Sequence, residues 1–398
     1  MRVCITTEQR FVRTPDSYVW APTVASYSFW RRYLDVFDEA RVIARVANIG
    51  AAEPSWRRAD GEGVSFGNVP YYVGPLQYAR RYLALRKAVQ QVVSDGDAVI
   101  MRVSSHIAAC LESTLSSDRP FGLEIVGDPY EVFAPGSIDH PLRPLLRWWF
   151  TRTMRRECQN AAAVAYVTSG VLQDRYHAKR DAFKTSYSSI ELPEDAFVDA
   201  PRRWDQPPRP VRVIAVGSLE QMYKGFDVLI DAVACCRCKG LDLELDIVGD
   251  GRFRSALERR ALTRGIQQKV RFAGQISGAC QVREHLDRAH LFVLPSKTEG
   301  LPRAMVEAMA RGLPCIGSTV GGIPELLSSE DLVARGDAGA LANKIVEVVS
   351  QPARLTRMSE ANHARARNFH DSILRPKRRL FLDHVRKTTQ DWNYARSV

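Results

Sequence analysis

Residues 296–325 read Ser-Lys-Thr-Glu-Gly-Leu-Pro-Arg-Ala-Met-Val-Glu-Ala-Met-Ala-Arg-Gly-Leu-Pro-Cys-Ile-Gly-Ser-Thr-Val-Gly-Gly-Ile-Pro-Glu. Just before them, His290-Leu-Phe-Val-Leu-Pro295 is a short apolar run that ends in proline, which is typical of a buried strand. Gly300 and Pro302 then open a run of good helix formers that ends at Gly312. The stretch therefore predicts a strand, a loop, a helix and a further strand, as in a parallel sheet with crossover helices.

Two glutamates in this stretch are candidate ligand-binding residues. The predicted helix begins with backbone amides that have no partner inside the helix, and such an end favours a phosphate. Glu307 lies one to two turns into the helix among apolar neighbours, where a carboxylate is costly unless a donor such as a sugar hydroxyl bonds to it. Glu299 lies eight residues earlier, in the loop. Taken alone, Glu307 also fits a partly exposed helix residue and Glu299 a helix cap.

The whole motif is more specific than either glutamate. Glu-x7-Glu, followed by Ala-Met-Ala-x-Gly-x-Pro-x-Ile and Val-Gly-Gly-Ile-Pro-Glu, resembles the donor-site signature of the retaining glycosyltransferases of family 4. The resemblance implies an α/β protein with the GT-B fold, in which two Rossmann-like domains face a central cleft. It implies that Glu299 contacts the transferred sugar and that Glu307 holds the ribose of the nucleotide. The backbone around Gly300 and Leu301 would meet the diphosphate.

A second loop follows the strand expected over 211–216. It reads Gly217-Ser-Leu-Glu-Gln-Met-Tyr-Lys-Gly225, and from this position Lys224 can reach a diphosphate as a point charge, although a lone lysine is more often a solvated surface charge. In the family that the motif resembles, this loop usually carries both an arginine and a lysine. Here Ser218 stands near the expected arginine, so part of the positive charge must come from elsewhere, with Arg303 and Arg10 as candidates.

The other candidates lie in loops after strands of the same half, where folds of this kind bind their ligands. The full set of candidate donor-binding residues is Gly217, Ser218, Lys224, Gly249, Gln275, Ile276, Gly300, Leu301, Pro302, Arg303 and Glu307. The candidate catalytic residues are Glu299, Lys224 and Asp128, since Gly127-Asp128 stands about where relatives often have His-Asp. We expect no metal, because the sequence shows no Asp-x-Asp pair at a strand end, and no cofactor, because the nucleotide sugar is a co-substrate.

Length and patterning predict two domains. The 398 residues are long for one core and suit two domains of ordinary size. Residues 1–200 alternate strands and helices and form the expected acceptor-binding domain, although the loop predicted over 8–20 lacks the Gly-Gly pair of many relatives. Residues 205–371 form the expected donor-binding domain, after a proline-rich linker over 192–210. The resemblance implies that a C-terminal helix, 372–398, packs back on the first domain.

Charge and hydropathy bear on partners and location. The net charge of +11 implies an anionic partner, for which nucleotide phosphate, nucleic acid and a membrane surface are the choices. We expect no nucleic acid, because no module that binds it is recognised. A helix is predicted over 143–156, with Leu145, Leu146, Trp149 and Phe150 on one side and arginines on the rest of its surface. We favour packing of the apolar side on the sheet. Peripheral contact with the inner face of a membrane is the alternative.

Location is predicted from three further observations. No apolar run approaches the ~20 residues that span a bilayer. The start of the chain turns polar too soon for a signal peptide. The eight cysteines show no disulfide framework, and Cys235, Cys236 and Cys238 are more typical of helix packing than of a metal site. We expect a cytoplasmic protein with reduced thiols.

These features predict a retaining, metal-independent glycosyltransferase. It would move a sugar from a UDP-sugar, with a GDP-sugar as the second choice, to a glycan, lipid-linked or small-molecule acceptor. Lys224 and the amides near Gly300 would stabilise the charge that gathers on the leaving diphosphate. Two alternatives stay open. One is a GT-B enzyme of different chemistry, such as a nucleotide-sugar epimerase or a phosphorylase, and the other is a catalytically idle relative that acts as a binding subunit.

Overall fold

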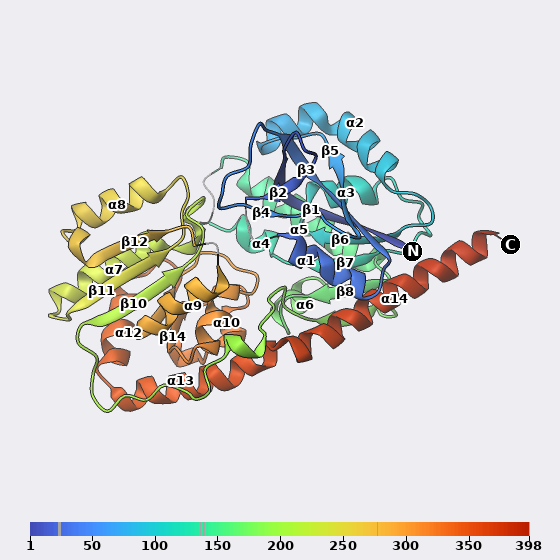
Figure 1. The fold of residues 1–398 in the computed structure, drawn as a ribbon. Helices are drawn as coiled ribbons and strands as arrows, with labels where there is room; N and C mark the ends of the chain where they lie inside the picture. Colours follow the sequence, from blue (N-terminus) through green and yellow to red (C-terminus); the bar gives the residue numbers. More distant parts are fainter. Residues whose placement is uncertain (23–24, 136, 138–139, 277, 398) are drawn as a thin grey trace. The chain divides into compact units, whose positions relative to one another are not determined.

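The structure, a computed structural model, describes residues 1–22, 25–135, 137, 140–276 and 278–397, and these form two compact units (Figure 1). Unit 1 comprises Met1–Gly127, Trp149–Tyr187 and Arg375–Val398. Unit 2 comprises Asp128–Trp148 and Ser188–Leu374. Each unit is built on a mostly parallel sheet with helices packed against it, so the predicted α/β class with two parallel-sheet domains is confirmed.

Unit 1 is organised around strand β1 (Arg2–Arg13), which pairs in parallel with β3 (Glu39–Asn48) on one side and β6 (Ala98–Val103) on the other. The parallel part of the sheet has the order β5-β3-β1-β6-β7-β8-β9. The remaining parallel strands are β5 (Val64–Val69), β7 (Gly122–Ile125), β8 (Ala163–Tyr166) and β9 (Phe183–Ser186). Valine, isoleucine and alanine dominate the central strands, as expected for strands that are buried on both faces.

Strand β1 is longer than predicted, which corrects the loop expected over 8–20. After an irregularity between Thr6 and Arg10, β1 continues to Arg13. It then pairs antiparallel with β2 (Val19–Ala21), and β2 pairs with β4 (Arg57–Arg58). The chain therefore leaves the carboxyl end of β1 through a hairpin, and β2 and β4 extend the sheet there.

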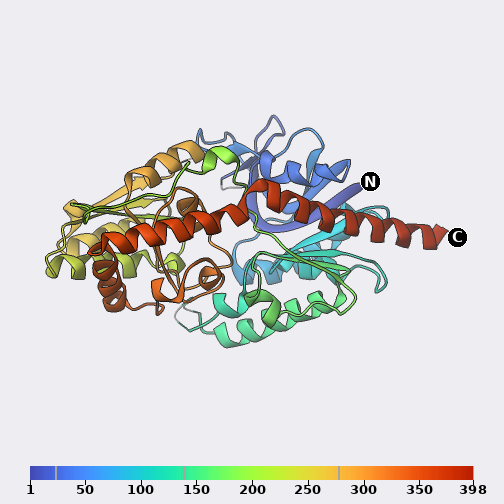
Figure 2. The ribbon, with the colours of Figure 1, turned by 90° about the horizontal axis from the view of Figure 1, so that it is seen from below.

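Helices of unit 1 cover this sheet. They are α1 (Tyr27–Arg31), α2 (Gly74–Val92), α3 (His106–Glu112), most of α5 (Arg143–Asn160), α6 (Val171–Arg175) and most of α14 (Asp371–Ser397). The 27-residue α14 is the long red helix in Figure 2. Its Phe381 and Val385 pack so closely on Gly122 of β7 that an added Cβ would collide with both. No helix in the described part of the chain is long and apolar enough to cross a bilayer.

Helix α5 packs through only part of the stripe that the sequence suggested, and the packed face continues along the second half of the helix. Its buried residues are Thr151, Met154, Glu157 and Cys158. Leu145 and Trp149, which belong to the stripe predicted to pack, are 56% and 37% exposed. The stripe is thus divided, because the Phe150 ring lies 4.8 Å from that of His106 of α3, whereas Leu145 faces solvent.

Unit 2 holds a six-stranded parallel sheet in the order β12-β11-β10-β13-β14-β15. The strands are β10 (Val211–Val216), β11 (Leu243–Val248), β12 (Val270–Gly274), β13 (Leu291–Leu294), β14 (Cys315–Ser318) and β15 (Leu332–Val333). The chain adds β11 and β12 on one side of β10 and then returns to build outward on the other side. The order reverses between β10 and β13, and sheets of this kind bind ligands beyond the strand ends at such a point.

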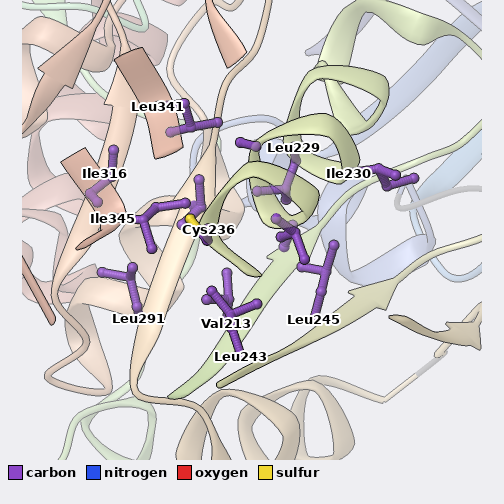
Figure 3. Close-up of a cluster of buried hydrophobic side chains, with 14 of the residues drawn as sticks. Val213, Leu229, Ile230, Cys236, Leu243, Leu245, Leu291, Ile316, Leu341 and Ile345 are labelled. Carbon is purple, nitrogen blue, oxygen red and sulfur yellow. The ribbon is translucent and has the colours of Figure 1, made fainter. Parts of the chain in front are cut away.

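The core of unit 2 supports those strand ends (Figure 3). Helices α7 (Phe226–Cys238) and α12 (Ala338–Val349) pack together, and their Leu229, Cys236 and Ile345 meet Val213 and Leu291 of the sheet. Each fully buried aliphatic side chain is worth roughly 1.5–3 kcal/mol relative to exposure. The other helices of unit 2 are α4 (Pro129–Val132), α8 (Arg254–Thr263), α9 (Ala279–Arg288), α10 (Arg303–Ala310), α11 (Ile323–Leu326) and α13 (Pro352–Ala366).

Residues 192–210, predicted as a linker, are bonded to unit 2 instead. The Arg202 guanidinium donates to the carbonyls of Leu286 and Ala289, at the end of α9, and of Arg311, at the end of α10. Val198 N donates to the carbonyl of Ala310 at 3.1 Å. Because the last carbonyls of a helix have no partner within it, these donors complete both helix ends. The segment is thus part of unit 2, and the chain changes units between Tyr187 and Ser188.

Candidate functional site

An ion pair between Lys224 and Glu299 forms the centre of the candidate site. Lys224 ends a short 3-10 helix, η3 (Met222–Lys224), in the loop after β10, and Glu299 lies in the loop after β13. The Lys224 Nζ to Glu299 Oε1 distance is 2.6 Å, and the two side chains are 14% and 7% exposed. The Ser296 hydroxyl donates to the same Oε1 atom at 2.7 Å. Two predicted residues therefore meet where the strand order reverses.

Two glycines allow the loops to approach this closely. Gly225 has φ +73°, and a Cβ there would collide with the carbonyl of Pro295. Gly321 has φ +52°, and a Cβ there would collide with the carbonyl of Glu299. Only glycine adopts such a conformation without strain. The Val-Gly-Gly stretch that the sequence singled out therefore packs on the backbone of Glu299.

Lys224 stays charged in this setting. Burial lowers the pKa of the Lys224 ammonium, but Glu299 and Tyr223 raise it, and the net shift is upward. On the other partner, the Oε2 atom of Glu299 accepts no hydrogen bond from any residue that the structure describes. The site thus offers a fixed positive charge and, beside it, a carboxylate oxygen that can accept from a ligand hydroxyl.

The first turn of α10 adds to the positive potential. The N-cap residue of α10 is Pro302, whose side chain cannot accept a hydrogen bond from the first amides of the helix. Within the described ranges, the amides of Gly300 and Leu301 donate to no acceptor. Arg303 opens the helix and is near enough to lower the pKa of both Lys224 and Glu307. Arg303 therefore supplies a second positive charge near Lys224. This fits the expectation that Arg303 takes over from the arginine that is absent at position 218, where this chain has serine. Arg10 lies in β1 of unit 1.

Glu307 is a desolvated carboxylate to which none of the described residues donates a hydrogen bond. Met305, Val306 and Ala308 around it on α10 are fully buried. Burial raises the pKa of Glu307, while Arg303 and Arg283 act in the opposite direction without cancelling the shift. In the part of the chain that the structure describes, no donor bonds to its carboxylate. A carboxylate held in this way calls for an explanation, and a bound ligand with hydroxyl groups provides one.

The loops after β10, β11 and β12 lie side by side. Gly217 N donates to the carbonyl of Val248, and Gly249 N to that of Gly274, both at 2.9 Å. An added Cβ on Gly217 would touch the side chain of Lys224 at 3.4 Å. The structure thus brings Gly217 and Gly249 to the loop of Lys224.

The remaining predicted residues lie around this cluster. Ser218 is exposed, and its hydroxyl accepts from the amide of Glu220 at 3.2 Å. Gln275 and Ile276 follow β12, the edge strand, two strands away from β10. Asp128 is 1% exposed and caps α4 by accepting from the amide of Tyr130 at 3.0 Å. The cap explains the burial of Asp128, and a catalytic role for it stays a prediction.

Several residues near the candidate site were not predicted from the sequence. Lys297 Nζ bonds Asp227 of α7 at 3.0 Å and so fixes the loop of Glu299 to that helix. Arg335 donates to the carbonyl of Lys297 at 3.2 Å and lies 3.7 Å from Glu131 of α4. Ser296 and Lys297 directly follow the buried strand, and this position is the signal that could have identified them. Arg335 comes after the motif in an unremarked stretch and gave no such signal.

The Lys224–Glu299 pair makes a prediction about stability. Lys224→Met leaves a buried carboxylate unpaired, so we expect a loss of roughly 2–3 kcal/mol, somewhat below the cost of a fully buried orphan charge because water reaches both side chains. The double variant Lys224→Met/Glu299→Gln removes that charge and should recover most of the loss. Urea unfolding near neutral pH measures both, with Lys239→Met, an exposed lysine, as the matched control. A double variant no more stable than the single one would contradict the prediction.

Glu307 makes a prediction about pH. Because its folded pKa is raised, ionisation penalises the folded state above the unfolded pKa of about 4.3, and the penalty grows up to the folded pKa. Glu307→Gln should therefore raise the melting temperature near neutral pH and lose this advantage at about pH 4, where the native carboxyl is largely protonated. Thermal unfolding at the two pH values checks this. A variant that is less stable at both would show that the carboxylate has a protein partner.

Comparisons with known proteins agree with this geometry. Residues 210–351, which hold the strands and loops described above, match the family described as glycosyl transferases group 1. Protein CapJ of Staphylococcus aureus is 27% identical over 326 residues, or 80% of each chain. The amylovoran biosynthesis glycosyltransferase AmsK of Erwinia amylovora is 35% identical over 143 residues, which cover 34% of this chain and 35% of AmsK.

Solved structures show the fold. Sucrose-phosphate synthase from Thermosynechococcus elongatus aligns with a TM-score of 0.70 at 15% identity, over 96% of this chain and 99% of that one. HepE from Anabaena, solved in complex with UDP and glucose, aligns with a TM-score of 0.64 at 16% identity, over 100% and 99%. The predicted GT-B fold is thereby confirmed. Residues 210–351 are thus similar to the glycosyl transferases group 1 family, on a fold that the chain shares with these solved structures.

Proposed function

We propose that this protein is a glycosyltransferase that moves a sugar from a nucleoside diphosphate sugar to a carbohydrate acceptor with retention of configuration. The observation that carries the proposal is the Lys224–Glu299 pair at the reversal of strand order. The Glu307 carboxylate, to which no described residue donates, adds to it, because Arg303 acts on the charges of both Lys224 and Glu307. UDP is the favoured nucleotide, which the complex of HepE with UDP and glucose supports. A carbohydrate acceptor is supported by the name of another relative, the lipopolysaccharide core biosynthesis glycosyltransferase LpsE of Rhizobium meliloti, which is 33% identical over 143 residues, or 35% of this chain and 40% of LpsE.

The proposed reaction uses the charges of unit 2. As the bond from the anomeric carbon to the phosphate oxygen breaks, negative charge gathers on the diphosphate. Lys224, Arg303 and the amides of Gly300 and Leu301 stabilise it, and one such group is commonly worth ~10²–10³ in turnover. Glu307 accepts from the ribose hydroxyls, and Glu299 accepts from a hydroxyl of the sugar through Oε2. These roles divide nucleotide binding from stabilisation of the reacting sugar.

Retention follows if the acceptor approaches from the face that the diphosphate leaves. The acceptor oxygen then forms its bond to the anomeric carbon, and its proton passes to an oxygen of the departing diphosphate. No nucleophile from the protein is needed. We propose that Lys224 and Arg303 supply the positive charge for the leaving diphosphate and that the reaction is independent of a metal ion.

The test is to incubate the protein with UDP-glucose, UDP-galactose, UDP-N-acetylglucosamine and GDP-mannose and to measure release of the nucleoside diphosphate, with and without EDTA. We expect slow hydrolysis of one donor that EDTA leaves unchanged, and a product whose first-formed anomer has the donor configuration by NMR. Conversion of one nucleotide sugar into its epimer would favour the epimerase alternative. Binding of a donor that is never consumed would favour the idle binding subunit.

Two variants sharpen this test. Glu307→Ala should weaken the affinity for free UDP, measured by calorimetry, because it removes the acceptor for the ribose hydroxyls. Glu299→Gln should leave that affinity nearly unchanged and lower turnover by about 10²-fold, since the loss falls on the transition state rather than on ground-state binding. Equal effects of both variants on UDP affinity would contradict the division of roles.

We also propose that α5 contacts an anionic bilayer at its surface. Leu142, Leu145 and Trp148 are exposed at the start of this helix, and the arginines at 143, 147 and 152 lie among them. Such a combination of apolar and basic side chains favours the interface of an anionic membrane. Co-sedimentation should show binding to vesicles with phosphatidylglycerol and little to phosphatidylcholine alone. Leu145→Ser should weaken it, whereas Leu262→Ser, on the exposed side of α8, should not. Equal loss in both variants would contradict the proposal.

A further inference from the structure

A hollow of about 620 Å³ opens in unit 1, a size within the ~300–1,000 Å³ of small-molecule sites. It lies where the parallel strands β1 and β3 end at Arg13 and Asn48, the edge of an α/β sheet at which ligands bind. Its walls are the turn between β1 and β2 and the connection from β3 to β4. The lining residues that matter here are Pro15, Asp16, Trp20, Glu53, Pro54 and Trp56.

The walls are held by hydrogen bonds. In the first wall, Thr14 N donates to the carbonyl of Tyr18 at 3.1 Å, and the indole N–H of Trp20 donates to the Thr14 hydroxyl at 2.9 Å. In the second, Trp56 N donates to the carbonyl of Glu53 at 3.0 Å. The two walls are joined at their base, where Ile49 N donates to the carbonyl of Arg13 at 2.9 Å. Both indole rings are thus attached to an ordered backbone.

Polar groups in this hollow remain available to a ligand. Across the described ranges of the chain, the indole N–H of Trp56 has no acceptor and the Glu53 carboxylate has no donor. Asp16 uses its Oδ1 atom for the Thr14 hydroxyl and the amide of Tyr18, and its Oδ2 atom has no partner among the described residues. The side chains of the hollow therefore present the Trp56 N–H as a donor, carboxylate acceptors and two half-buried indole faces.

The chemistry of the lining restricts the ligand. None of the described lining residues is Lys or Arg, which argues against a phosphate or a nucleotide. An ammonium ligand would suit the indoles and carboxylates, but it has no lone pair to accept from the N–H of Trp56. A sugar hydroxyl both donates and accepts. The C–H face of a pyranose, slightly positive, also lies well against the negative face of an indole ring.

We infer that this hollow binds an uncharged saccharide unit of the acceptor. The ring would stack on Trp56 or Trp20, its hydroxyls would donate to Glu53 and Asp16, and a ring or hydroxyl oxygen would accept from the N–H of Trp56. The assignment to the acceptor rests on the proposed function. The binding of a saccharide does not, since it follows from the lining of unit 1 alone.

The experiment is fluorine NMR of the full chain labelled with 5-fluorotryptophan, with the Trp56 signal assigned by Trp56→Phe. The probes are short neutral oligosaccharides of glucose, galactose, mannose and N-acetylglucosamine, with choline and inorganic phosphate as charged probes. We expect at least one oligosaccharide to shift the Trp56 signal and neither charged probe to do so. Trp56→Ala should weaken that binding, read from the other tryptophan signals or by calorimetry, by about tenfold or more, the scale of losing an aromatic anchor.

Glu53→Gln keeps the shape of the side chain and should weaken binding about threefold or more, because a charged acceptor is lost. The matched control is Glu39→Gln, at the opposite end of β3, which should bind as the wild type does. The inference is overturned if no oligosaccharide shifts the Trp56 signal, if choline or phosphate shifts it instead, or if Glu53→Gln binds as tightly as the wild type. This last variant keeps the test open should Trp56→Ala fail to fold.

The measurement needs neither a donor nor turnover. A protein that binds an oligosaccharide through Trp56 yet consumes no nucleotide sugar would overturn the proposed function and support the hollow as a saccharide site. A protein that transfers sugar while Trp56 stays unperturbed by every oligosaccharide would do the reverse. Transfer with weaker saturation by an acceptor in Trp56→Phe supports both.

Discussion

The close approach of two loops at the reversal of strand order is the constraint on which the candidate site depends. Parallel strands β10 and β13 are neighbours, so the loops that follow them leave the same edge of the sheet side by side. Gly225 and Gly321 let the backbones come within contact distance of Pro295 and Glu299. Lys224 and Glu299, 75 positions apart in the sequence, can then form a nearly buried ion pair with an Nζ to Oε1 distance of 2.6 Å. Any Cβ at those glycines would force the loops apart.

The candidate site also contains a residue, Glu307, that lowers the stability of the folded protein. Glu307 is ionisable, desolvated and without a donor from the described protein, although a glutamine or an aliphatic residue would suit its apolar neighbours better. The rest of α10 offsets this unfavourable free energy, because its buried residues and its capped C-terminus hold the helix in place. Strained or unsatisfied groups that persist in a well-packed unit point to binding.

Much of unit 2 could be predicted from the sequence, because its signals are local. The apolar run before Pro295, the helix formers after Pro302 and the glycines at 321 and 322 each fix a piece of structure within a few residues, and their order fixes the fold. What the sequence could not show depends on partners far along the chain. β1 continues to Arg13 because β3 and β2 pair with it. The sequence of residues 8–13 alone gives no signal of this pairing. Which part of the α5 stripe packs is likewise decided by its surroundings, since Phe150 meets His106 of α3 while Leu145 stays exposed.

The capping of α9 and α10 by Arg202 has a consequence for how such chains can be recombined. A proline-rich stretch between two domains is the usual place to join halves of different proteins. Here a junction within 192–210 would join unit 2 of one chain to a 192–210 segment from another, and the Arg202 guanidinium would then meet helix ends of a different sequence. The boundary that keeps every such bond within one parent lies between Tyr187 and Ser188. Segment 192–210 therefore has to be exchanged together with the rest of unit 2.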